Sequence, residues 1–161
     1  MRAFVIAVVL AATLAVGAAA AVQRETAPET TAATFPRGTA TIATGKRTIP
    51  LRIEIARTAE QRQQGLMNRR SLPANAGMVF QYPSPTRGGF WMKNTLIPLD
   101  IAFYDGSGRV LRTMRMQPCA ADPCTIYDPG VAYRAALEVN AGSFRRWGVK
   151  RGARIVVKPA R

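Results

Sequence analysis

Histidine is absent from this chain of 161 residues, and its absence excludes several common kinds of catalytic and metal-binding site. A Ser-His-Asp triad and a Cys-His pair both need an imidazole as the proton acceptor. Zinc and iron sites built on imidazole ligands are excluded for the same reason. Acid–base chemistry would have to come from Asp, Glu, Lys, Tyr or Cys side chains. The sequence predicts no cofactor and no metal, and it favours a protein that is not an enzyme.

Acidic residues are scarce as well. The chain has 9 Asp and Glu residues and 23 Lys and Arg residues, so its formal net charge is +14. A basic surface attracts anionic ligands. An arginine-rich, solvated surface that binds nothing explains the same charge, and the sequence favours this interpretation. The basic residues are scattered and no nucleic-acid motif interleaves them with aromatics, so we expect no nucleic-acid partner. The oligomeric state is not readable from the sequence.

Long apolar runs are missing from the chain except at its N-terminus. Arg2 precedes residues 3–21, which are apolar apart from Thr13 and Gly17. This pattern, followed by small residues at 18–20, is typical of a signal peptide, so we expect residues 1–21 to be cleaved on export. The alternative is an uncleaved anchor, because the run is long enough to span a bilayer. We therefore expect a periplasmic or cell-envelope protein that meets a membrane only through this segment if it is retained.

Residues 22–36 contain few large apolar side chains and much Thr, Ala, Glu and Pro, a composition typical of a flexible tether. Residues 37–161 are expected to form one domain. Within it, Ile49, Leu51, Ile53 and Ile55 alternate with other residues, which indicates a half-buried strand. Further strands are expected at 40–43, 77–81, 89–92, 99–104, 110–116, 136–140 and 154–158.

Two short helices are expected beside these strands. Thr58 and Gln61 form a capping box, which predicts a helix over 59–67 on the outside of the domain. Ser143 is expected to cap a helical turn that ends at Gly148. The predicted fold class is α+β and mostly β, a small barrel-like or sandwich-like domain of short strands with one or two short helices.

Cysteine occurs only twice, at Cys119 and Cys124. In an exported protein, two cysteines this close predict a disulfide. A redox-active pair is a weaker alternative, because no helix start follows to lower the pKa of a thiol. A copper(I) site built from Met114, Met116 and Cys119 is a third alternative, since all three offer soft ligands.

Several motifs resemble those of the bacterial and archaeal family known as domain of unknown function 192. The resemblance covers nearly all of residues 37–161 and is carried by these segments: Gly65-Leu66-Met67, Gly77-Met78-Val79-Phe80, Phe90-Trp91-Met92-Lys93-Asn94-Thr95, Pro98-Leu99-Asp100-Ile101 and Leu137-Glu138-Val139-Asn140-Ala141-Gly142. The resemblance implies a small, compact, β-rich domain, often behind a signal peptide. It implies no activity that can be carried over to this chain.

One surface is predicted as the candidate site. If the apolar residues of strands 99–104 and 136–140 face one core, the polar residues between them project to the other side. The predicted site residues are Arg69, Arg70, Trp91, Lys93, Asn94, Thr95, Asp100, Glu138 and Asn140. A groove of this composition suits a sugar or another polar envelope component. The alternative is that the charged residues form structural ion pairs and that Trp91 fills the core.

Two functions compete for this predicted surface. The first is a non-catalytic binding or accessory module for a polar or anionic envelope component, such as an envelope polysaccharide. The second is a small hydrolase of envelope glycans with Asp100 and Glu138 as its acid and base, which requires the two carboxyl groups to flank one glycosidic bond.

Overall fold

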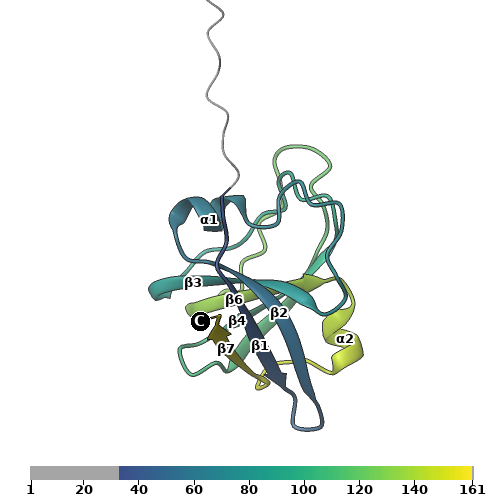
Figure 1. Ribbon diagram of the computed structural model, residues 1–161. Helices are drawn as coiled ribbons and strands as arrows, with labels where there is room; N and C mark the ends of the chain where they lie inside the picture. Colours follow the sequence, from purple (N-terminus) through teal and green to yellow (C-terminus); the bar gives the residue numbers. More distant parts are fainter. Residues whose placement is uncertain (1–32, 161) are drawn as a thin grey trace, which may run out of the picture. The chain divides into compact units, whose positions relative to one another are not determined.

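The computed structural model describes residues 33–160. The predicted signal peptide and residues 22–32 of the predicted tether lie outside the described residues. Seven strands form one sheet in the order β5-β4-β6-β3-β2-β1-β7 (Figure 1). The strands are β1 (Arg37–Ala43), β2 (Thr48–Ala56), β3 (Ala76–Thr86), β4 (Leu99–Tyr104), β5 (Val110–Met116), β6 (Tyr133–Asn140) and β7 (Arg154–Pro159). Two helices accompany them, α1 (Ala59–Gln64) and α2 (Ser143–Trp147), so the predicted fold class is confirmed.

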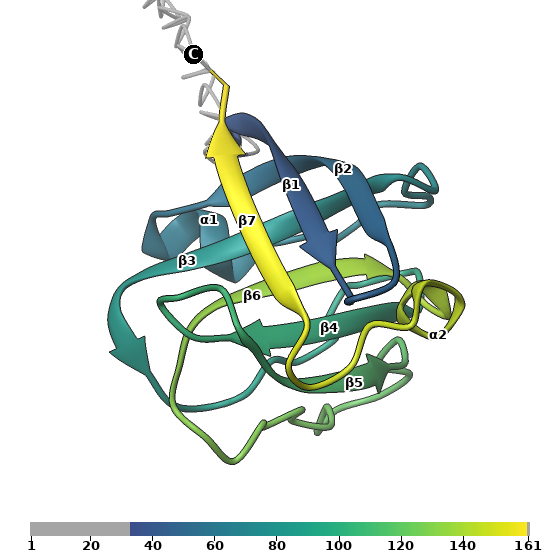
Figure 2. The ribbon, with the colours of Figure 1, turned by 90° about the horizontal axis from the view of Figure 1, so that it is seen from below.

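The sheet curls until its two edge strands meet. Most neighbouring strands are antiparallel, whereas β2 and β3 are parallel and are joined by a crossover that contains α1. At the seam, Arg109 and Arg154 form an isolated bridge, and the Val110 amide donates to the Ala153 carbonyl at 2.8 Å. Figure 2 shows β7, β1 and β2 crossing the layer made by β6, β4 and β5, while α2 lies at one end of the curl. The result is a half-barrel in which both sheet faces can be covered.

Two cores lie on the two faces of this sheet. The inner core contains buried residues from all seven strands, including Leu51, Val139 and Ile155, together with Phe144 of α2. The outer core is built mainly on β3, β4 and β6, and the connecting segments cover it with side chains such as Leu66. Apolar surface is therefore buried on both sides of the central strands, which contributes most of the stabilisation.

The first helix begins at a local capping box, whereas the second begins without one. Thr58 and Gln61 form the predicted capping box, with the Gln61 amide donating to the Thr58 hydroxyl at 3.2 Å, and no residue of α1 is buried. The prediction that Ser143 caps the second helix is wrong, because Gly142 occupies the N-cap position without a side-chain bond. Among residues 33–160, no helix is long and apolar enough to cross a membrane.

The expected strand at 89–92 is absent from the sheet. Phe90 instead makes a single antiparallel bridge with Tyr127 outside the named strands. The chain then turns, because Asn94 adopts a left-handed conformation with φ of 55° and the Thr95 amide donates to the Met92 carbonyl at 3.1 Å. This irregular segment covers the outer core through Phe90 and Met92.

Candidate functional site

Asp100 is a structural carboxylate that joins three elements. It is 4% exposed and lies on the inner-core side of β4. Its Oδ1 accepts a bond from Arg115 Nε on β5 at 3.1 Å, and its Oδ2 accepts one from the Phe144 amide in α2 at 3.1 Å. Asp100 thus satisfies a free backbone donor at the start of α2, the role that the sequence had suggested for Ser143.

Glu138 lies on the opposite face of the sheet from Asp100. In the antiparallel register Asp100 pairs with Val139, and Ile101 pairs with Glu138. Glu138 is 4% exposed, and burial raises the pKa of its carboxyl to about 8. Within residues 33–160 it makes no ion pair and accepts no side-chain hydrogen bond.

The predicted single groove containing both carboxylates is therefore wrong. The prediction placed the apolar residues of β4 and β6 on one face, but the register sets Leu99 and Ile101 against the outer core and Leu137 and Val139 in the inner core. Two carboxyl groups on opposite faces of a sheet cannot flank one glycosidic bond. The geometry does not favour the hydrolase alternative.

Trp91 and Lys93 belong to a separate, exposed surface beside the cysteine loop. Trp91 is 44% exposed, so it does not fill the core. Lys93 Nζ lies 5.9 Å from the centroid of the Trp91 ring and pairs with Asp122 at 2.9 Å. Thr95 is buried in the turn that follows, and Asn94 is exposed. These residues share no groove with Asp100 or Glu138.

Cys119 and Cys124 form the predicted disulfide, with their Cα atoms 5.5 Å apart. Together with Asp122 they are the one group of potential metal ligands among the described residues. Because the disulfide removes both thiolates, the oxidised protein offers a metal ion only one ligand of this group, the carboxylate of Asp122. Met116 is fully buried in the outer core and Met114 packs against it, so packing accounts for both methionines.

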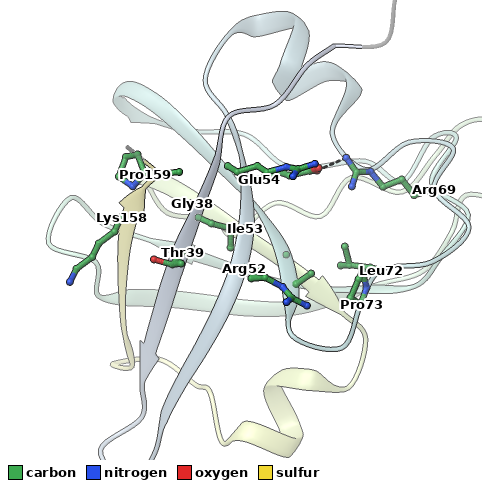
Figure 3. Close-up of a pocket in the computed structure, with 14 residues that line it drawn as sticks. Gly38, Thr39, Arg52, Ile53, Glu54, Arg69, Leu72, Pro73, Lys158 and Pro159 are labelled. Atoms are coloured by element: carbon green, nitrogen blue, oxygen red, sulfur yellow. Dashed lines mark hydrogen bonds and ion pairs between the residues drawn. The ribbon is translucent and has the colours of Figure 1, made fainter.

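A groove of about 690 Å³ lies over the outer side of β1, β2 and β7 (Figure 3). Its floor follows the strand register, in which Lys158, Thr39 and Arg52 form one row across three strands. Arg37 and Glu54 form the next row. One wall is the segment before β3, which contributes Leu72 and Pro73; Pro159 and Ala160 also line the groove.

Two predicted site residues contribute to this groove. Arg69 lines it and forms an ion pair with Glu54, while its guanidinium lies 5.8 Å from the Phe35 ring centroid. Asn140 holds the wall in place, because its Nδ2 donates to the carbonyls of Leu72 at 2.7 Å and Pro73 at 3.3 Å. Arg70 is exposed and does not line the groove.

The groove is strongly cationic. Four basic side chains, Arg37, Arg52, Arg69 and Lys158, line it together with one carboxylate, that of Glu54. Glu54 is engaged by Arg69, whereas Arg37, Arg52 and Lys158 form no ion pair within the described part of the chain. A cluster of this kind lowers the energy of an anion placed against the floor.

Sequence reasoning missed three of these four cations. The alternation in residues 49–55 does place Arg52 and Glu54 on one side of β2, and this signal was available. Nothing local indicates that β7 pairs with β1 and brings Lys158 beside Thr39, because the two strands are more than a hundred residues apart.

These features define a small, basic, β-rich domain of one curled sheet with a cationic groove on its outer side. The model of the family DUF192, described as an uncharacterized ACR, matches residues 40–157, and the chain belongs to this family. The resemblance found in the sequence is therefore confirmed. Comparison with curated proteins gives no match.

Two solved structures are similar to this chain. One is the crystal structure of a Sinorhizobium meliloti protein described as a candidate transcription regulator. The two sequences are 31% identical, the match covers 78% of this chain and 96% of the Sinorhizobium chain, and the TM-score is 0.73. The other is a protein of unknown function from Novosphingobium aromaticivorans, 33% identical, which covers 73% of this chain and 83% of its own with a TM-score of 0.68.

Proposed function

We propose that this protein is a non-catalytic binding module for an anionic component of the cell envelope and that the cationic groove is its binding site. The observation that carries the proposal is the convergence of Arg37, Arg52 and Lys158 on one groove. Its one carboxylate among the described residues, that of Glu54, already pairs with Arg69. Converging cations on a concave surface concentrate anions there. Neither carboxylate proposed for hydrolysis lines the groove.

Two observations support a place of action outside the cytoplasm. The first is the N-terminal sequence, which has the three parts of a signal peptide. The second is the disulfide between Cys119 and Cys124, since structural disulfides are typical of oxidising compartments and rare in the cytosol. For an exported basic protein, the anionic polymers of the envelope are the most abundant potential ligands.

The description of the Sinorhizobium relative suggests DNA as a competing anionic ligand. The helices of the described residues span six and five residues. Neither presents a long exposed helix of the kind that reads base edges in a major groove. We therefore propose an envelope ligand for this chain and include duplex DNA as a comparison in the test.

The proposal is tested by sedimentation with isolated cell-wall and envelope polymers, followed by mass spectrometry of the supernatant. We expect the wild-type protein to sediment at low salt and to be released at about 0.5 M NaCl, where the screening length is only a few Å. An Arg52→Gln, Lys158→Gln double variant should stay in the supernatant. Arg112→Gln, Arg151→Gln removes the same two charges from exposed positions outside the groove; it is the matched control and should sediment normally.

Three outcomes would overturn the proposal. New soluble fragments released from the polymers would make the protein an enzyme. Equal sedimentation of the wild type and the double variant would place binding outside the groove. Preferential binding of duplex DNA of random sequence over every envelope polymer would identify a nucleic-acid ligand.

A further inference from the structure

The groove combines its cationic floor with an apolar wall. Leu72 and Pro73 line one side and Pro159 lines the opposite end (Figure 3). The long stems of Arg52 and Lys158 add further hydrocarbon surface beneath their charged heads. Among residues 33–160, no Trp, Tyr or Phe side chain lines the groove, and Trp91 lies on another surface. A sugar ring would therefore find no flat aromatic partner in the groove, whereas a hydrocarbon chain would find apolar contacts.

The floor positions its charges for one small acidic group. Lys158 and Arg52 stand in one row on either side of Thr39. Neighbouring strands are about 4.8 Å apart, so the Cα atoms of Lys158 and Arg52 are separated by roughly 10 Å. Flexible side chains from both ends of that span can reach a single phosphate or carboxylate placed above Thr39, whose hydroxyl can donate to it.

The apolar wall is held in place before any ligand binds. The Arg52 amide donates to the Asn75 carbonyl at 2.9 Å, and Arg52 Nη2 donates to Asn75 Oδ1 at 3.1 Å. Asn140 fixes the carbonyls of Leu72 and Pro73 from β6. A preformed wall reduces the ordering entropy lost on binding. The volume of about 690 Å³ falls within the usual range for sites that hold one small molecule.

We infer that the groove binds an amphipathic anion, a single hydrocarbon chain that ends in one acidic headgroup. The headgroup lies on Arg52, Thr39 and Lys158, and the chain lies along Leu72 and Pro73. This inference rests on the proposed function, because it names the ligand class of the same groove. It adds that the apolar part of the ligand contributes to its affinity.

The test is isothermal titration calorimetry of the full protein with three probes. Decyl phosphate, used below its micelle-forming concentration, carries both parts of the inferred ligand; inorganic phosphate carries only the anion, and decyl maltoside only the chain. We expect decyl phosphate to bind at least about tenfold more tightly than inorganic phosphate, since burying even two methylenes contributes that much. It should also bind more tightly than decyl maltoside, because the maltoside headgroup carries no charge to pair with Arg52 and Lys158.

Variants separate the two parts of the site. Arg52→Gln, Lys158→Gln should weaken the binding of decyl phosphate about tenfold or more, whereas the control Arg112→Gln, Arg151→Gln should leave it unchanged. Leu72→Gln should reduce the affinity for decyl phosphate to the affinity for inorganic phosphate. Because Leu72 also packs against the outer core, Pro73→Ser, an exposed position, provides a second variant with the same expected direction.

The inference is overturned if decyl phosphate binds no more tightly than inorganic phosphate, or if both wall variants bind it normally. In that case, salt-sensitive binding of an anionic polymer that depends on Arg52 and Lys158 would leave the proposed function intact. If neither decyl phosphate nor any anionic polymer binds, both the inference and the proposed function fail.

Discussion

Replacing Glu138 with glutamine should stabilise the protein at pH 9 and leave its stability at pH 4.5 unchanged. Glu138 is buried between Met78 of β3 and Ile101 of β4, its register neighbours on the same face. Burial raises the pKa of its carboxyl from 4.5 to about 8. Glutamine resembles the protonated acid in shape and polarity, so the variant keeps the packing and removes the titration.

The sign of the pH dependence follows from proton binding. Below pH 4.5 the carboxyl is protonated in both folded and unfolded chains, so ionisation costs nothing. As the pH rises towards 8, the unfolded chain releases the proton while the folded chain retains it, and the free energy of unfolding decreases. Above about pH 8 both states are ionised and the loss is complete. A rise in pKa from 4.5 to about 8 corresponds to a loss on the order of 5 kcal/mol.

The assay is urea unfolding followed by circular dichroism at pH values from 4.5 to 9, with wild type and Glu138→Gln side by side. Because the chain has no histidine, no side chain with an ordinary pKa titrates between pH 5 and 8. The α-amino group is common to both proteins, so its contribution cancels in their difference. If the two stability curves run parallel over this range, Glu138 titrates as a solvated carboxyl and the reasoning is refuted.

Three further changes test the structural assignments. Asp100→Ala should destabilise the protein by roughly 2 to 3 kcal/mol, because two hydrogen bonds to a buried carboxylate are lost. Trp91→Ala should leave the melting temperature nearly unchanged. Equal shifts in the melting temperature of the two variants would contradict the assignment of Trp91 to the surface. Replacing both Cys119 and Cys124 with serine should lower the free energy of unfolding by about 2 kcal/mol in urea titrations, and no change would mean that the loop is rigid without its disulfide. Gly77→Ala should cost about 3 kcal/mol or prevent folding, because the new Cβ would lie 2.5 Å from a backbone carbonyl oxygen of β6, and a variant with wild-type stability in the same titrations would refute this close approach.

Local sequence patterns predicted the elements of this fold well. The alternation around Leu51 marks β2, the capping box at Thr58 marks α1, and the turn after Tyr104 marks the β4–β5 hairpin. These patterns depend on residues that are close in sequence and on backbone geometry, so they can be recognised without knowing the tertiary structure.

The face that each strand presents was not predictable in the same way. An alternating strand such as residues 99–104 looks half-buried, but every residue of β4 is buried, because connecting segments cover its outer side. The pairing of Ile101 with Glu138 decides which carboxylate lies on which face, and only the register of β4 against β6 determines that pairing. A shift of one residue would exchange the two faces.

The candidate site depended on still longer-range information. Arg69 and Asn140 were identified from the sequence, but the cations of β1 and β7 enter the groove only because the last strand pairs with the first. Scattered basic residues in the sequence become a cluster through this pairing. The net charge left both an anionic ligand and a solvated surface without a ligand open, and it did not indicate where an anion would bind.

The most direct test of the account is a ¹⁵N–¹H NMR titration of the protein with an anionic envelope polymer at low salt. The account predicts that the largest shift changes occur at Thr39, Arg52 and Lys158 and that they disappear in the Arg52→Gln, Lys158→Gln variant. Changes centred on Trp91 and Lys93, with the groove amides unmoved, would contradict the assignment of the groove as the binding site.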